Sequence, residues 1–179
     1  MKFLIASDLH GSSFYTDKIL EVAKKENADK IILLGDIFNH GPRNPLPKDY
    51  APLKVAESLN NVKDKLIVIQ GNCDSQVDTM ISDFDFVPHA LVVSGDKTVF
   101  CTHGHVYNKD SMPKTTFNAV IYGHFHVCFI EQLDSGIIVA NPGSLSLPKN
   151  DTPPAYLILE DGTLTLKTLE GEGVKTVTL

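Results

Sequence analysis

Three short stretches of the sequence carry pairs of metal-binding side chains at alternate positions. They are Asp8-Leu9-His10, His103-Gly104-His105 and His124-Phe125-His126, and alternate residues of an extended segment lie on one side of it. Oxygen and nitrogen ligands in this mixture suit a divalent ion such as manganese, iron, cobalt or zinc, and contain too much nitrogen for a dedicated magnesium or calcium site. With Asp36 and Asn72 the candidates number eight, which is too many for one ion and enough for two.

Each stretch by itself has an ordinary explanation. Gly35-Asp36 and Gly71-Asn72 are common turn sequences, and a His-x-His pair on a surface strand is usually solvated. However, five of the seven histidines fall into these clusters, and each cluster follows a short apolar run. Coincidence at five places is a poor explanation, so the sequence predicts a metal centre.

The apolar runs before these side chains predict β-strands, because they are short and rich in β-branched residues. Together with one later run, they cover residues 2–7, 31–34, 66–70, 98–102, 119–122 and 137–140. Two stretches with helical spacing separate the first three runs, one over 19–23 and one over 55–59 behind Pro52. A third helix is expected after Ser75 as its N-cap, with an inward apolar face made of Val77, Met80 and Ile81.

This alternation of strands and helices predicts a parallel sheet in the first half of the chain. After about residue 86 the runs are joined by two-residue turn signals, Gly95-Asp96, Ser135-Gly136 and Asp161-Gly162, which predict antiparallel hairpins. The expected fold class is α/β, with two sheets packed face to face and helices outside. Ligands bind beyond the carboxyl ends of strands in open α/β sheets, so the candidate side chains should converge there.

Length and composition favour one globular domain over residues 1–179, with 42% hydrophobic and 21% charged residues. No apolar run reaches the roughly 18 to 20 residues of a membrane span, and no signal peptide is recognisable. Three cysteines without a CxxC pair predict a reducing cytoplasm rather than a disulfide framework. The net charge of −6 and the thinly spread basic residues argue against long nucleic acid as partner. No membrane partner is expected either, because no spanning run occurs, while a homo-oligomer is left open.

Taken together, five motifs resemble those of the calcineurin-like metallophosphoesterases, in the expected order and over nearly the whole chain. They are Asp8-Leu9-His10, Gly35-Asp36, Gly71-Asn72-Cys73-Asp74, Thr102-His103-Gly104-His105 and Gly123-His124-Phe125-His126. The short length, Gly41-Pro42-Arg43-Asn44 and Asn141-Pro142-Gly143-Ser144 are similar to the small YfcE-type bacterial phosphodiesterase branch. The resemblance implies a four-layer α-β-β-α sandwich of two mixed sheets with outer helices.

The resemblance also implies two divalent ions, with manganese as the first choice and iron, zinc, cobalt or nickel as alternatives. One ion would be held by Asp8, His10, Asp36 and His126, and the other by Asp36, Asn72, His103 and His124. His105 matches a position near the second ion that often contacts substrate. Two such ions, about 3.5–4 Å apart, lower the pKa of a bridging water, and the hydroxide would attack phosphorus in line. The expected substrate is a small-molecule phosphodiester.

Two further residues are candidates for contact with the substrate. Cys73 stands where most of the family carries a histidine that protonates the leaving group. A thiol with a pKa of about 8.5 is a poorer acid than an imidazolium at about 6.5, and the alternative role for Cys73 is a small filler. Arg43 is the only arginine and follows Asp36 in the chain. It would clamp a phosphoryl oxygen, unless it is a solvated loop residue.

Two other functions stay open at this point. A phosphomonoesterase would use the same centre, so the ligands do not separate it from a diesterase. A non-catalytic, protein-binding scaffold resembling the retromer small subunit should have lost several ligand positions, and none is lost here. Catalysis by a protein nucleophile is not indicated, because the only arginine precedes the first cysteine and no Gly-x-Ser-x-Gly or P-loop sequence occurs.

Overall fold

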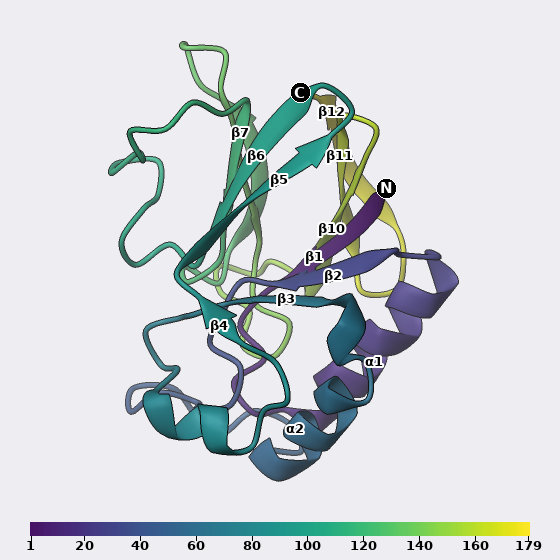
Figure 1. Cartoon of the computed structure of the whole chain (residues 1–179), viewed down its shortest axis with the longest axis vertical. Coiled ribbons are helices and arrows are strands. Elements are labelled where there is room, and N and C mark those ends of the chain that lie inside the picture. The colour runs from purple at the N-terminus through teal and green to yellow at the C-terminus, as the bar shows by residue number, and fades with distance from the viewer.

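The computed structural model describes all residues from 1 to 179 and contains two β-sheets that pack face to face (Figure 1). The first has seven strands in the order β12-β11-β10-β1-β2-β3-β4. They are β1 (Lys2–Ala6), β2 (Lys30–Leu33), β3 (Leu66–Ile69), β4 (Phe86–Val87), β10 (Ala155–Glu160), β11 (Thr163–Thr168) and β12 (Gly173–Thr178). Strands β1 to β4 are parallel, as the strand–helix alternation predicted, and β10 pairs with β1 in the antiparallel sense.

The second sheet has five strands in the order β5-β6-β7-β9-β8. They are β5 (His89–Ser94), β6 (Lys97–Thr102), β7 (Ala119–Tyr122), β8 (Cys128–Gln132) and β9 (Ile138–Pro142). The turn signals correctly predicted the hairpins β5–β6, β8–β9 and β10–β11. The sheet as a whole is mixed, as the resemblance implied, because β7 runs parallel to both β6 and β9. The long segment 103–118 carries the chain back across the sheet, so β7 can run in the same direction as β6.

Two helices, α1 (Ser13–Lys25) and α2 (Pro52–Asn60), lie on the outer face of the seven-stranded sheet (Figure 1). Helix α1 begins where the Ser12 hydroxyl accepts a hydrogen bond from the Tyr15 N–H, which satisfies a free donor of the first turn. Pro52 occupies the start of α2, as predicted. The buried faces of both helices join a cluster of 18 buried residues on this side of the sheet. A short 3₁₀ turn, Lys63–Lys65, precedes β3.

The third predicted helix is wrong in type and in orientation. Residues Gln76–Met80 form a short 3₁₀ helix, although Ser75 is its N-cap as expected. Val77 and Met80 do not face inward, since 63% and 81% of their surfaces are exposed, and Ile81 is only partly buried. Strand β4 beside this helix has two residues, so no broad sheet surface is available for an apolar helix face to cover.

The two mixed sheets of the predicted fold are confirmed, and 18 buried residues from both sheets fill the space between them. The outer helical layer is present on the seven-stranded sheet only. On the five-stranded sheet the irregular segment 103–118 replaces it, and Tyr107 and Phe117 pack there on Phe100. This segment has no run with helical spacing, so aromatic side chains from a loop cover the sheet instead. No helix of the structure combines the length and apolar character needed to cross a membrane.

Candidate metal centre

Seven of the predicted ligands meet at one edge of the two sheets, where parallel strands end. The first sheet contributes Asp8, His10, Asp36 and Asn72, and the second contributes His103, His124 and His126. Each residue lies just beyond the carboxyl end of β1, β2, β3, β6 or β7. This edge is the place at which open α/β sheets bind ligands, as the strand pattern predicted.

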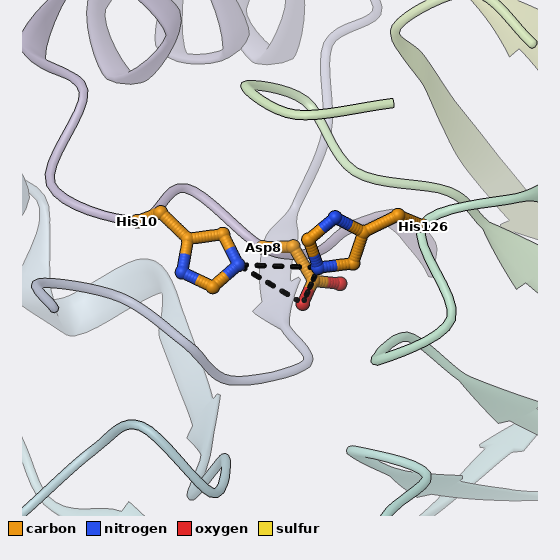
Figure 2. A group of neighbouring side chains, drawn as sticks. All are labelled: Asp8, His10 and His126. Carbon is orange, nitrogen blue, oxygen red and sulfur yellow. Dashed lines mark hydrogen bonds and ion pairs between the residues drawn. The ribbon is translucent and has the colours of Figure 1, made fainter. Parts of the chain in front are cut away.

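Asp8, His10 and His126 form a first group of facing side chains (Figure 2). The Nε2 atoms of His10 and His126 lie 3.2 Å apart. Asp8 Oδ1 lies 3.7 Å from His10 Nε2 and 3.3 Å from His126 Nε2. Asp36 Oδ2 approaches the group from β2, at 3.8 Å from His10 Nε2. All four side chains are buried, and together they are the set that the resemblance assigned to one ion.

Asp36 also faces a second group of side chains. Its Oδ1 atom lies 3.4 Å from His103 Nε2. The same nitrogen is 3.1 Å from Asn72 Oδ1 and 3.3 Å from His124 Nδ1. Asp36 therefore stands between the two groups with one oxygen toward each. Asn72 and His124 are more exposed than the other ligands, so the second group is open to solvent.

Three of the histidines are oriented by backbone carbonyls. The Nδ1 atoms of His10, His103 and His126 lie 2.8, 2.7 and 2.7 Å from the carbonyl oxygens of Asn39, Leu34 and Leu147. Because a carbonyl only accepts hydrogen bonds, each Nδ1 carries a proton and donates it. In the neutral rings each Nε2 then presents a lone pair to the centre, which is the orientation found in metal-binding histidines.

The backbone that carries the ligands adopts an uncommon conformation. Asp8, His10, Asp36, His124 and His126 have positive φ angles of 57°, 47°, 54°, 66° and 62°. Such left-handed residues are infrequent outside glycine and cost of order 1–3 kcal/mol each where they are strained, so surrounding contacts must hold them. The ligands therefore do not converge as alternate residues of extended strands, as the sequence pattern suggested. Tight left-handed turns aim them instead.

Asp74 supports these turns, a role that the sequence did not indicate. Its Oδ2 atom accepts hydrogen bonds from the N–H groups of Asp36 and Gly71, at 2.8 and 2.7 Å. Its Oδ1 atom accepts one from the N–H of Ile37 at 2.8 Å. Burial raises the pKa of Asp74 to about 6 in spite of these hydrogen bonds. A Cβ atom on Gly71 would overlap Asp36 Oδ1, so the two turns can approach only because residue 71 is glycine.

The end of β9 and the segment after it fix two more ligand-bearing turns. The hydroxyls of Ser144 and Ser146 both donate to the backbone carbonyl of Asp8, each at 2.9 Å. Asn141 Nδ2 donates to the carbonyl of Gly123 at 2.8 Å, directly before His124. The sequence of residues 141–144 is similar to that of other proteins, but it does not predict these hydrogen bonds, because no local pattern encodes long-range contacts.

The electrostatics of the centre fit a divalent cation. Asp8 Oδ1 is buried without a hydrogen-bond partner, which is costly unless a charge satisfies it. Burial works to raise the pKa values of Asp8 and Asp36, but the neighbouring histidines hold both below the ordinary value. Burial lowers the pKa of His103, yet the carboxylates of Asp36 and Asp8 outweigh it and raise this pKa to about 9. The residues therefore fit a bound cation at this position.

An open cleft of about 830 Å³ lies over the centre. Asp36, Cys73, His124 and His126 line it from the ligand side, where Cys73 Sγ lies within 4.8 Å of ligand atoms of His10 and Asp36, and the side chains of Arg43 and Lys149 also line it. Arg43 and Lys149 are exposed, and Lys149 is a second cation that the sequence did not indicate because it is remote from Arg43 in the chain. Burial, reinforced by the charge of Asp36, raises the pKa of Cys73 to about 12.

His105 is the one predicted site residue that stands apart. Its ring centroid is 5.3 Å from that of His103 and 6.3 Å from that of His124. Gly104 has a φ angle of 120°, so the chain is not extended between the two histidines. As a result His105 lines a neighbouring cavity rather than the cleft over the ligands.

Two facing sheets and a cluster of acidic and histidine ligands at their strand ends define a metal-dependent phosphoesterase. Residues 1–163 match the calcineurin-like phosphoesterase superfamily domain, and the chain belongs to this family, as the motifs predicted.

The relatives agree with this assignment. Phosphodiesterase YfcE of Escherichia coli is 42% identical over 176 residues, which cover 97% of this chain and 95% of that protein. The solved structure of E. coli YfcE superposes with a TM-score of 0.94 at 40% identity, with 99% of each chain covered. The probable metallophosphoesterase YsnB of Bacillus subtilis is 28% identical, over 89% of this chain and 83% of its own length. The predicted enzyme class, a metal-dependent phosphodiesterase, is confirmed.

A more distant structure shares the architecture alone. Vps29 of Chaetomium thermophilum has a TM-score of 0.68 at 14% identity, with 99% of this chain and 97% of its own covered. Identity this low shows a common fold and carries no information on activity.

Proposed function

We propose that the chain hydrolyses small phosphodiesters with two divalent metal ions, through in-line attack of a hydroxide that bridges them. The observation that carries this proposal is the position of Asp36. Its two oxygens face two separate groups of ligands, at 3.8 Å from His10 Nε2 and 3.4 Å from His103 Nε2. A carboxylate shared by two ions needs this arrangement.

Each candidate residue has a role in this proposal. Asp8, His10, Asp36 and His126 would hold one ion, and Asp36, Asn72, His103 and His124 the other. When bound, the ions would activate water and neutralise the phosphoryl oxygens. Arg43 would bind a phosphoryl oxygen at the cleft, and Cys73 would lie near the leaving group as a poor proton donor. Manganese is the first choice, although the donor set also suits iron, zinc, cobalt and nickel.

Two alternatives use the same fold. A phosphomonoesterase would need the same ligands, so only substrates can separate it from a diesterase. A protein-binding scaffold would not require a carboxylate oxygen, Asp8 Oδ1, that is buried without a hydrogen-bond partner. It would also not require five candidate ligands in left-handed turns, so both observations favour a metal-dependent enzyme. We further propose that residues 1–179 act as one cytoplasmic domain without long nucleic acid or membrane as partner. The pairing of β10 with β1 supports one domain, and a homo-oligomer stays open.

The test begins with chelation of the purified protein, followed by reloading with Mn²⁺, Ni²⁺, Co²⁺, Zn²⁺ or Mg²⁺. Turnover of bis(4-nitrophenyl) phosphate and of 4-nitrophenyl phosphate is then measured with the bound metal. We expect no turnover after chelation, recovery on reloading, two ions per chain and preference for the diester. Full activity without metal, or saturation with one ion, would contradict the two-metal proposal. Preference for the monoester would favour a phosphomonoesterase. No turnover with any ion would favour a protein-binding scaffold.

A further inference from the structure

A second cavity lies beside the cleft that covers the metal centre. Its volume is about 440 Å³, and it shares no lining residue with that cleft. Two of its lining residues directly precede predicted ligands, since Gly71 comes before Asn72 and Thr102 before His103. The cavity therefore borders the more exposed of the two ligand groups, on a different side from the main cleft.

His105 connects this cavity to the centre. Its side chain lines the cavity, while its ring centroid lies 5.3 Å from that of His103 and 6.3 Å from that of His124. A group bound in the cavity would thus lie against His105 on one side and extend toward the ligands on the other. This position is different from that of Cys73 and Arg43, which line the main cleft.

Two of the rings that line the cavity, His89 and Tyr107, pack on the buried ring of Phe100. His89 stacks on Phe100 with centroids 5.0 Å apart and an interplanar angle of 20°. Tyr107 stands edge-on to both, at 6.3 Å from His89 and 5.7 Å from Phe100. Pro88 and Val106 add apolar surface, Gln70 and Thr102 add polar groups, and no Asp, Glu, Lys or Arg side chain lines the cavity. Rings held in this way favour a planar, uncharged group and lose little freedom when it binds.

We infer that this cavity binds the retained organic arm of a phosphodiester and prefers a planar ring there. The inference rests on the proposed function. A diester has two organic arms, and the arms diverge from a tetrahedral phosphorus. The arm that leaves belongs in the main cleft beside Cys73. In the reaction a P–O bond to the water oxygen forms and the P–O bond to that arm breaks, with its electron pair leaving on the oxygen of the arm. The proton that the water loses passes to solvent or to the departing oxygen. The arm that stays on phosphorus binds in the second cavity. A monoester has no such arm, so it leaves this cavity empty.

The test fills the cavity and compares esters that share 4-nitrophenolate as leaving group. Val106→Trp adds bulk at a lining residue that is 54% exposed and so should not disturb the fold. For phenyl 4-nitrophenyl phosphate we expect kcat/KM to fall by about tenfold or more, the scale expected for loss of a buried ring. For methyl 4-nitrophenyl phosphate kcat/KM should fall less. For 4-nitrophenyl phosphate it should change by less than about twofold, because this monoester has no second arm.

Leu91→Trp is the matched control, because Leu91 is 51% exposed on β5 next to the cavity and does not line it. This variant should leave kcat/KM unchanged for the phenyl diester, the methyl diester and the monoester. Equal loss on the monoester and the phenyl diester in Val106→Trp, or no loss on either, would overturn the inference.

A binding measurement gives a readout besides activity. The chain has no tryptophan, so Tyr107→Trp places a single tryptophan in the cavity wall, and its emission reports on that wall. In manganese-loaded protein, phenylphosphonate should change its emission and methylphosphonate should not. Equal responses to the two would overturn the inference. If the wild-type protein hydrolyses none of the three esters with any ion, the proposed function fails, and the phosphonate titration still decides whether the cavity binds a ring.

Discussion

The floor of the site (Asp8, His10, Asp36, His103 and His126) and its rim (Arg43, Cys73, His105 and Lys149) are built in different ways. The floor residues are buried, most stand in left-handed turns, and the three histidines are each fixed by a carbonyl. Arg43, His105 and Lys149 are exposed, and Cys73 is half-buried. The fold itself thus provides the arrangement of the floor, while the rim can adjust to a substrate. Changes in the floor should affect all substrates alike, and changes in the rim should discriminate among them.

The largest effect is expected for Asp36→Asn, which removes the charge shared by the two ligand groups. Turnover of every ester should fall by more than the roughly 100-fold that loss of a supporting partner costs. The fold should change little because most of the core lies elsewhere, so circular dichroism should match that of the wild type. Metal content should fall in parallel. Wild-type turnover in this variant would refute the role of Asp36, and Asp85→Asn, on the surface, is the control.

A smaller effect is expected for Asp74→Asn, which tests how much the support of the floor matters. Asparagine keeps one oxygen acceptor but loses the second, so at least one of the three backbone N–H groups that donate to Asp74 loses its partner. Metal affinity and turnover should fall about 10- to 100-fold, equally for mono- and diesters. The comparison is Asp78→Asn, which removes a carboxylate that caps the nearby 3₁₀ helix. Selective loss of one ester class would place Asp74 in the rim instead.

Arg43→Ala probes the rim. Loss of the guanidinium should raise KM for phosphate esters by about tenfold, the scale of one charge-assisted hydrogen bond, and change kcat less. Arg43→Lys should restore part of the affinity, because a point charge lacks the paired donors of arginine. Steady-state kinetics give KM and kcat for these variants. The control is Lys54→Ala, which removes an exposed cation on α2. Unchanged KM and kcat would show that the loop points away from the substrate.

The smallest effect is expected for Cys73→Ala. Since the thiol is a poor acid, its removal should change kcat little across a series of leaving groups. Cys73→His should flatten the dependence of kcat on leaving-group pKa and help alkyl esters most, because general acid catalysis contributes about 10²- to 10⁴-fold. Cys128→Ala, outside the cleft, is the matched control. A large loss in Cys73→Ala at unchanged metal content would show that the thiol takes a direct part.

The sequence by itself determined which residues could form the centre and roughly where they would lie. Short apolar runs that end in Asp, Asn or His encode strand ends locally, and parallel strands end at one edge of a sheet. For this reason Asp8, Asp36 and His103 could be predicted to meet without any structure. Hairpins with two-residue turns could be predicted for the same local reason.

Only the tertiary structure decided what depends on contacts between distant segments. Val77 and Met80 have helical spacing, but they stay exposed because no sheet surface lies beneath them. His105 is two residues from His103, yet the positive φ angle of Gly104 directs the side chain of His105 toward another cavity. The supporting hydrogen bonds of Ser144 and Asp74 join turns that lie far apart in the chain. Such contacts leave no local pattern, because their free energy depends on the packing of the two whole sheets.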